Sequence, residues 1–125
     1  MKYSINAASL PDQSLPYSLG TTAGRLIFSS GLIAQSDSAV ELEALSVADQ
    51  FKSIIYQLET LLAECDCSLP DVAKVTIYLT QLETWSEIEE SFKLAFGSPE
   101  PALSLVEVKK LPSAAKIEMD AIACR

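Results

Sequence analysis

Apolar residues at three- and four-residue steps across positions 47–65 constrain the fold of this chain more than any other feature. This spacing predicts one long helix with a single apolar face, and that face needs a sheet or another helix to cover it. Ser46, with Asp49 three residues later, resembles a capping box at the start of the helix. The residues on the apolar face are Val47, Phe51, Ile54, Ile55, Leu58, Leu61, Leu62 and Cys65.

Alternating apolar and polar residues predict strands on both sides of this helix. The clearest are residues 74–79 and 116–124, in which every second side chain is apolar. A second helix is expected from the Thr84–Glu87 capping pattern to Gly97, and residues 37–43 are expected to form a loop. Shorter strands are predicted at 2–6, 17–21, 25–29 and 102–108, and Leu111-Pro112-Ser113 is expected to turn between the last two strands.

The predicted order of elements is β-β-β-α-β-α-β-β within one domain of residues 1–125. We interpret it as an α+β fold, a mixed β-sheet with two helices packed on one face. The other face of the sheet then has no cover from its own chain. We therefore expect a partner subunit to cover it.

Charge and composition exclude several classes of function. The net charge is −8, from 17 acidic and 9 basic residues, which disfavours nucleic acid and anionic membranes as partners. The absence of histidine excludes Ser-His-Asp and Cys-His catalysis and the common zinc sites. The four glycines are scattered, so neither a phosphate-binding loop nor a dinucleotide site is expected.

The cysteines and the N-terminus indicate the compartment. Three cysteines without a secretory leader predict free thiols in the cytoplasm, and no apolar stretch approaches the length of a membrane span. Cys65 and Cys67 form a CxC pair, for which a metal site is a weak alternative to ordinary residues at a helix end.

A few polar residues could line a small-ligand pocket. Tyr17 and Ser30 lie near predicted strand ends, beside Gly31. Glu118 and Asp120 lie two apart on the last strand and therefore share one face of it. The alternative is that this carboxylate pair only faces solvent, as charges on strands usually do.

Over nearly its whole length the sequence resembles the Rid family, the YjgF-like imine deaminases that are also called L-PSP endoribonucleases. The resemblance rests on Pro16-Tyr17-Ser18, Ser30-Gly31, residues 73–79 and the carboxy-terminal pattern that runs from Pro101-Ala102 to Ala121-Ile122-Ala123. It implies a chorismate-mutase-like fold and a homotrimer with three clefts between neighbouring subunits. It also implies hydrolysis of imines such as 2-iminopropanoate and 2-iminobutanoate without a cofactor.

The resemblance also implies roles for individual residues. Tyr17, Ser30 and Gly31 match the family's pocket positions, and Asp120 aligns with a glutamate that positions water for attack on the C=N carbon. Glu118 is expected to face the same cleft.

At three further positions the chain departs from the family pattern. Leu103 replaces the arginine that holds the substrate carboxylate, Leu105 stands where many members carry cysteine, and Glu89 replaces an asparagine beside the cleft. These changes make the expected cleft more negative and more apolar. The arginine could be replaced by another basic residue, such as Arg25 or Lys109.

These departures leave three hypotheses open. The first is a hydrolase that acts on C=N or related C–N bonds of a small neutral or cationic metabolite and is poor with 2-imino acids. The second is a trimer that binds or senses a metabolite without catalysis. The third is a decayed pocket. Ribonuclease activity, which has been attached to some relatives, is disfavoured by the acidity of the chain and by the absence of histidine.

Overall fold

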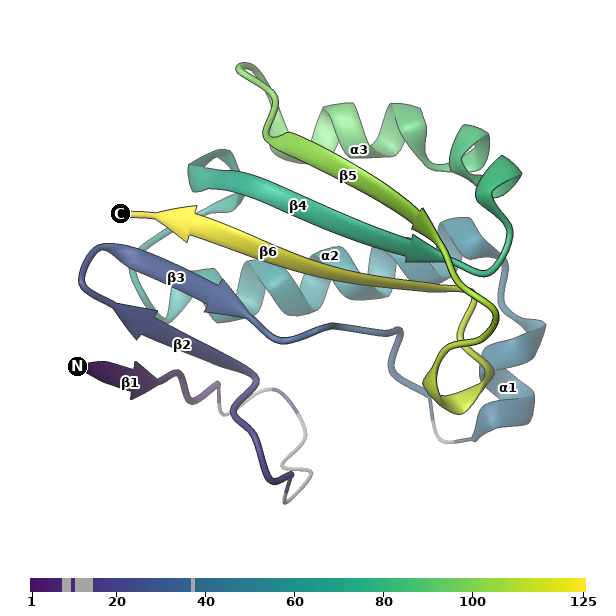
Figure 1. The fold of residues 1–125 in the computed structure, drawn as a ribbon, viewed down its shortest axis with the longest axis horizontal. Helices are drawn as coiled ribbons and strands as arrows, with labels where there is room; N and C mark the ends of the chain where they lie inside the picture. The colour runs from purple at the N-terminus through teal and green to yellow at the C-terminus, as the bar shows by residue number, and fades with distance from the viewer. Residues whose placement is uncertain (8–9, 11–14, 37) are drawn as a thin grey trace.

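A computed structural model of the chain describes residues 1–7, 10, 15–36 and 38–125. Six strands form one sheet, and two of the α-helices are long enough to pack along it (Figure 1). The elements are β1 (Lys2–Ser4), β2 (Gly20–Ala23), β3 (Leu26–Ser29), α1 (Ala39–Ala44), α2 (Val47–Ala63), β4 (Val72–Leu79), α3 (Glu89–Phe96), β5 (Ala102–Glu107) and β6 (Ile117–Cys124).

The sheet has the strand order β1-β2-β3-β6-β4-β5, so the last strand lies in the middle. β4 and β5 pair in parallel, because α3 carries the chain back across the sheet between them, and the other pairs are antiparallel. The prediction of a mixed sheet is therefore confirmed. The expected turn at Leu111-Pro112-Ser113 falls in the 3-10 helix Pro112–Ala114 between β5 and β6, but these two strands do not form a hairpin, because β6 inserts between β3 and β4.

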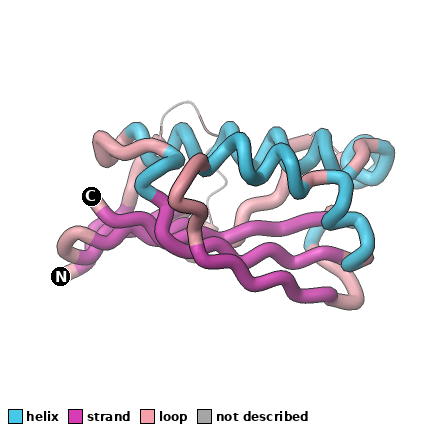
Figure 2. The backbone as a smooth tube through the Cα atoms, turned by 90° about the horizontal axis from the view of Figure 1, so that it is seen from above, coloured by secondary structure: helices cyan, strands magenta, loops and turns pink. Residues whose placement is uncertain are grey.

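Helices α2 and α3 both pack on the same face of the sheet, as Figure 2 shows. The apolar face of α2 is buried as predicted, with Ile54 fully buried against a core that includes Val75 and Ile77 of β4. The predicted start of this helix is confirmed, because the Ser46 hydroxyl oxygen accepts a hydrogen bond from the Asp49 N–H at 3.1 Å.

Two local predictions are wrong. Most of the expected loop at 37–43 is the short helix α1, whose N-cap Ser38 accepts from the Glu41 N–H at 3.1 Å; position 37 lies outside the described residues. The Thr84–Glu87 pattern lies in a 3-10 helix, Leu82–Glu87, and not at the start of α3. The Thr84 hydroxyl donates to the Gln81 carbonyl at 2.7 Å, and α3 begins after Ile88 without a side-chain cap.

The second face of the sheet carries no helix in the described part of the chain (Figure 2). Side chains at alternate positions of β4 and β6 point to this face, and they include Tyr78, Glu118 and Asp120. Among the described residues no helix is both long enough and apolar enough to cross a membrane. The candidate site is built on this face, where β4 and β6 carry these polar side chains.

Candidate functional site

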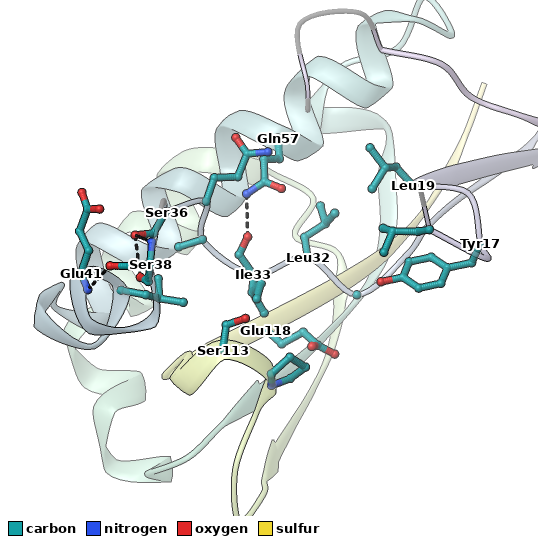
Figure 3. Close-up of a pocket in the computed structure, with 16 residues that line it drawn as sticks. Tyr17, Leu19, Leu32, Ile33, Ser36, Ser38, Glu41, Gln57, Ser113 and Glu118 are labelled. Carbon is teal, nitrogen blue, oxygen red and sulfur yellow. Dashed lines mark hydrogen bonds between the residues drawn. The ribbon is translucent and has the colours of Figure 1, made fainter. Parts of the chain in front are cut away.

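An open pocket of about 890 Å³ lies at the end of the sheet next to α1. It is bounded by the segments before β2 and after β3, by α1 and by one residue of α2, Gln57 (Figure 3). Tyr17, Gly31 and Glu118 line it, so three of the residues predicted from the sequence do meet in one place.

Backbone hydrogen bonds fix the segment that carries Gly31 against the middle of the sheet. The Leu32 N–H donates to the Met119 carbonyl at 2.8 Å, and the Met119 N–H donates back to the Leu32 carbonyl at 3.0 Å. On the other side, the Gln57 amide donates to the Ile33 carbonyl at 2.8 Å. Residues 31–33 are thereby held between β6 and α2.

Ser30 supports the pocket from behind and does not line it. Its N–H donates to the Leu19 carbonyl at 2.8 Å, and its hydroxyl donates to the Ser18 carbonyl. These bonds tie the end of β3 to the segment that carries Tyr17. Ser30 therefore contributes to the site by positioning that segment.

The Glu118 side chain lies directly against Gly31. A Cβ added at Gly31 would be 2.5 Å from the Glu118 Oε2 atom and 2.9 Å from its carboxyl carbon. Glu118 is half-buried at this position, and Figure 3 shows it on the floor of the pocket, with the Tyr17 hydroxyl directed inward above it. Burial, and secondarily the charge of Asp120, raises the pKa of the Glu118 carboxyl.

Asp120 lies one step along the same face but has a different partner. Its Oδ2 atom accepts a hydrogen bond from the Tyr78 hydroxyl at 3.1 Å, and it is not among the residues that line the pocket. Burial, then the charge and the hydrogen bond of Asp120, raise the pKa of the Tyr78 phenol. The two carboxylates on β6 therefore stand in different environments.

The pocket has a negative and partly apolar lining. Its described lining residues include two carboxylates, Glu41 and Glu118, and neither lysine nor arginine. The lining also includes apolar side chains, among them Leu15, Leu19 and Leu32. A small ligand with a positive charge, or with none, would fit this lining better than an anion.

Three other predicted residues lie elsewhere in the chain. Leu103 and Leu105 of β5 pack against the main core, on the face of the sheet that α2 and α3 cover, and Glu89 is exposed at the start of α3. A single chain therefore does not bring them to the pocket. Arg25, offered as a substitute for the arginine, is exposed and donates to the Arg125 carbonyl at 2.7 Å.

The cysteines are not gathered into a metal site. Cys65 and Cys67 are buried free thiols at the end of α2, Cys124 is an exposed one, and burial raises the pKa of the first two. In the described part of the chain, His, Cys, Asp and Glu side chains form no group of three or more that could hold a metal ion.

Sequence reasoning missed several polar lining residues, namely Gln35, Ser36, Ser38, Glu41, Gln57 and Ser113. Gln57 had a detectable signal, because it is a polar residue flanked by the apolar positions of α2 and is itself buried. Glu41 and Ser113 had none, since each reaches the pocket through a short local element, α1 or the 3-10 helix Pro112–Ala114.

Comparison with known proteins decides the family. The model of the family described as endoribonuclease L-PSP matches residues 7–125. The chain belongs to this family, the Rid family. A RutC family protein of Pyrococcus abyssi is 37% identical over 108 residues, which cover 86% of this chain and 85% of that protein. The human 2-iminobutanoate/2-iminopropanoate deaminase is 29% identical, over 95% of this chain and 87% of the human protein.

Solved structures agree with this family assignment. A Rid family protein of Yersinia pestis superposes with a TM-score of 0.90 at 25% identity, over 100% of both chains. A solved structure of a Thermotoga maritima protein gives a TM-score of 0.89 at 30% identity, over 100% of this chain and 98% of that one. The Rid fold predicted from the sequence is confirmed.

Proposed function

We propose that this Rid family protein hydrolyses the C=N bond of a small neutral or cationic imine that carries no carboxylate. The observation that carries this proposal is the lining of the pocket, in which Glu41 and Glu118 provide negative charge and no described residue provides positive charge. An anionic 2-imino acid would meet repulsion there, whereas a protonated imine would be attracted.

The position of Leu103 supports the same substrate class. By resemblance it stands where family members carry the arginine that holds the substrate carboxylate. An isobutyl group cannot donate the two parallel hydrogen bonds that arginine offers a carboxylate. Removing one partner of such a buried charge pair costs about 2–5 kcal/mol, which is enough to make 2-imino acids poor substrates.

The site is proposed to be completed by a neighbouring subunit of a homotrimer. Tyr17, Gly31 and Glu118 meet in one chain, whereas Leu103 and Leu105 lie on the edge strand β5 and Glu89 lies on α3. A second copy that covers the helix-free face could bring its own β5 and α3 to the first copy's pocket. Val106, 39% exposed on β5, is one apolar residue that such a contact would bury.

In the proposed reaction a carboxylate of β6 takes a proton from water while the water oxygen bonds to the imine carbon. The π electrons of the C=N bond move to nitrogen, which gives a neutral carbinolamine. The proton then passes to the nitrogen. The C–N bond breaks as the hydroxyl oxygen forms the carbonyl, and the carboxylate transfers the hydroxyl proton to the departing amine. Iminium and water are converted to an aldehyde or ketone and an ammonium ion, without any redox step.

The experiment compares two imines with the native protein. N-benzylidenemethylamine is apolar and becomes cationic on protonation, and its hydrolysis to benzaldehyde and methylamine is followed by absorbance. 2-Iminopropanoate, generated in situ, carries the carboxylate. We expect catalysis above the spontaneous rate for the first imine and little for the second. The Leu103→Arg variant should gain activity on 2-iminopropanoate, and Leu103→Met serves as its size-matched control.

Three outcomes would contradict the proposal. Rapid hydrolysis of 2-iminopropanoate by the native protein, or tight binding of 2-ketobutyrate, would mean that another group holds the carboxylate. No acceleration of either imine would instead favour a trimer that binds a metabolite without catalysis.

A further inference from the structure

The turn that precedes β6 holds two successive residues in an unfavourable backbone conformation. Ser113 and Ala114 have φ angles of 58° and 59°, in the left-handed region that a Cβ disfavours. Strain of this kind persists only where neighbouring contacts hold it in place, and it is common where a chain contacts a ligand. The turn is therefore a candidate for a role in ligand binding.

Contacts on both sides of the turn fix its position. The Ala115 N–H donates to the Pro112 carbonyl at 3.1 Å, and the Ala115 side chain is buried in a small cluster with Leu42 of α1. The next residue, Lys116, donates its N–H to the side-chain oxygen of Gln50 on α2 at 3.0 Å. The turn is thereby attached to both helices and is held beside the pocket.

Ser113 is the polar residue that this turn contributes to the pocket. Its side chain is exposed and belongs to the lining, and Figure 3 shows it between α1 and Glu118. Ser38 and Glu41 of the α1 segment also belong to the lining. The Ser38 hydroxyl oxygen accepts the Glu41 N–H at 3.1 Å, a bond that does not use the hydroxyl proton. These three residues give the α1 end of the pocket two hydroxyls and a carboxylate.

The polar groups of the lining match a ligand that both donates and accepts hydrogen bonds. Besides the carboxylates of Glu41 and Glu118, which only accept, the lining contains three serines, two glutamines and Tyr17, whose side chains do both. An apolar ligand would leave these groups unpaired, and an anion would be repelled by the carboxylates. The volume of about 890 Å³ is within the range of about 300–1,000 Å³ for pockets that hold drug-sized molecules, so a ligand with several such groups has room.

We propose that Ser38, Glu41 and Ser113 form a subsite for hydroxyl groups, and that the substrate is the imine of a polyhydroxylated carbonyl compound such as a sugar. The inference rests on the proposed imine hydrolysis and names its substrate class. A ligand hydroxyl can donate to the Glu41 carboxylate and accept from the Ser113 hydroxyl. The imine carbon lies at the Glu118 end, where water adds to it, the C–N bond breaks, and the sugar carbonyl and ammonia are released.

The kinetic test compares β-D-glucosylamine, which opens in water to the imine of glucose, with N-benzylidenemethylamine, which has no hydroxyl. After the spontaneous rates are subtracted, we expect kcat/KM of the native protein to be at least about tenfold higher for glucosylamine. Ser113→Ala should reduce this preference by about three- to tenfold, the loss expected for one neutral hydrogen bond. Ser113→Asn should retain most of it, because asparagine keeps a hydrogen-bonding side chain and tolerates the left-handed conformation.

Ala114→Gly is the matched control. It relieves the same kind of backbone strain at an exposed position outside the lining, so the native preference should remain. A merely structural role of the turn would change kcat/KM for both imines alike and would not separate alanine from asparagine at position 113. The inference is overturned if Ser113→Ala keeps the native preference, or if the native protein hydrolyses N-benzylidenemethylamine as efficiently as glucosylamine.

A binding measurement distinguishes failure of this inference from failure of the proposed function. Glucamine and hexylammonium are both six-carbon primary ammonium ions, and only glucamine carries hydroxyls; each is titrated at pH 8 by calorimetry. Glucamine should bind the native protein at least about fivefold more tightly, and Ser113→Ala should reduce that advantage. If neither imine is hydrolysed but this pattern holds, the hydrolase proposal alone fails. Equal binding of the two amines, or no binding of either, refutes the hydroxyl subsite even where imines are hydrolysed.

Discussion

Replacing Gly31 with alanine is the most direct test of the contact on which the site is built. The added Cβ would lie 2.5 Å from the Glu118 Oε2 atom, so that atom has to move about 0.9 Å to reach an ordinary contact at 3.4 Å. The atom displaced is the far end of a flexible side chain, and Gly31 has no positive φ angle. We therefore expect a loss of stability of only about 1 kcal/mol, at the lower end for overpacking.

The effect on activity should be much larger than the effect on stability. A catalytic group displaced by roughly 1 Å can lose on the order of 100-fold in rate, so kcat for N-benzylidenemethylamine should fall by about that factor. Gly24→Ala is the matched control, because Gly24 has a φ of 61° and nothing within 4 Å of an added Cβ. It should lose about 1 kcal/mol through backbone strain and keep its kcat.

Urea unfolding and the imine assay are run on the same protein preparations. The double variant Gly31→Ala/Glu118→Asp adds a coupling test, since the Glu118 Cγ atom lies 3.4 Å from the added Cβ and a shorter carboxylate relieves the contact. The double variant should be as stable as Glu118→Asp alone. Full activity in Gly31→Ala, or additive stability losses in the double variant, would refute the contact.

Three further outcomes follow from the structure. Glu118→Gln should stabilise the protein against urea at pH 7 but not at pH 3.5. The pKa of this carboxyl is raised in the folded state, so its ionisation opposes folding above its ordinary pKa. The native protein and the variant having the same urea midpoint at pH 7 would contradict this prediction. Gln50→Leu should lower the free energy of unfolding in urea by about 3 kcal/mol. The fully buried Gln50 amide donates to the carbonyls of Leu42 and Leu45, and its oxygen accepts from the Lys116 N–H. Gln81→Leu, at an exposed position, is the control and should change the stability little. Phe92→Ala should cost about 3–5 kcal/mol, whereas Leu94→Ala, 78% exposed on the same helix, should stay within about 0.5 kcal/mol of native; a similar loss in both would show that α3 does not pack as described.

Elements with a strong local period could be predicted from the sequence. The apolar stripe across 47–65 predicted α2, and the alternation in 74–79 and 116–124 predicted β4 and β6, because side-chain periodicity follows from local backbone geometry alone. Elements that depend on one or two hydrogen bonds could not be predicted. The cap at Ser38 started α1 where a loop was expected, and the Thr84 hydroxyl bonded a carbonyl where a cap was expected.

The candidate site divides in the same way. Local period alone determined that Glu118 and Asp120 share a face of the last strand, and composition alone excluded histidine chemistry. Only the tertiary structure decided which carboxylate enters the pocket. β6 inserts between β3 and β4, so Gly31 comes to lie under Glu118, and the Tyr78 hydroxyl reaches Asp120. That pairing joins residues 42 positions apart, and the period of a single strand does not encode which neighbour it will meet.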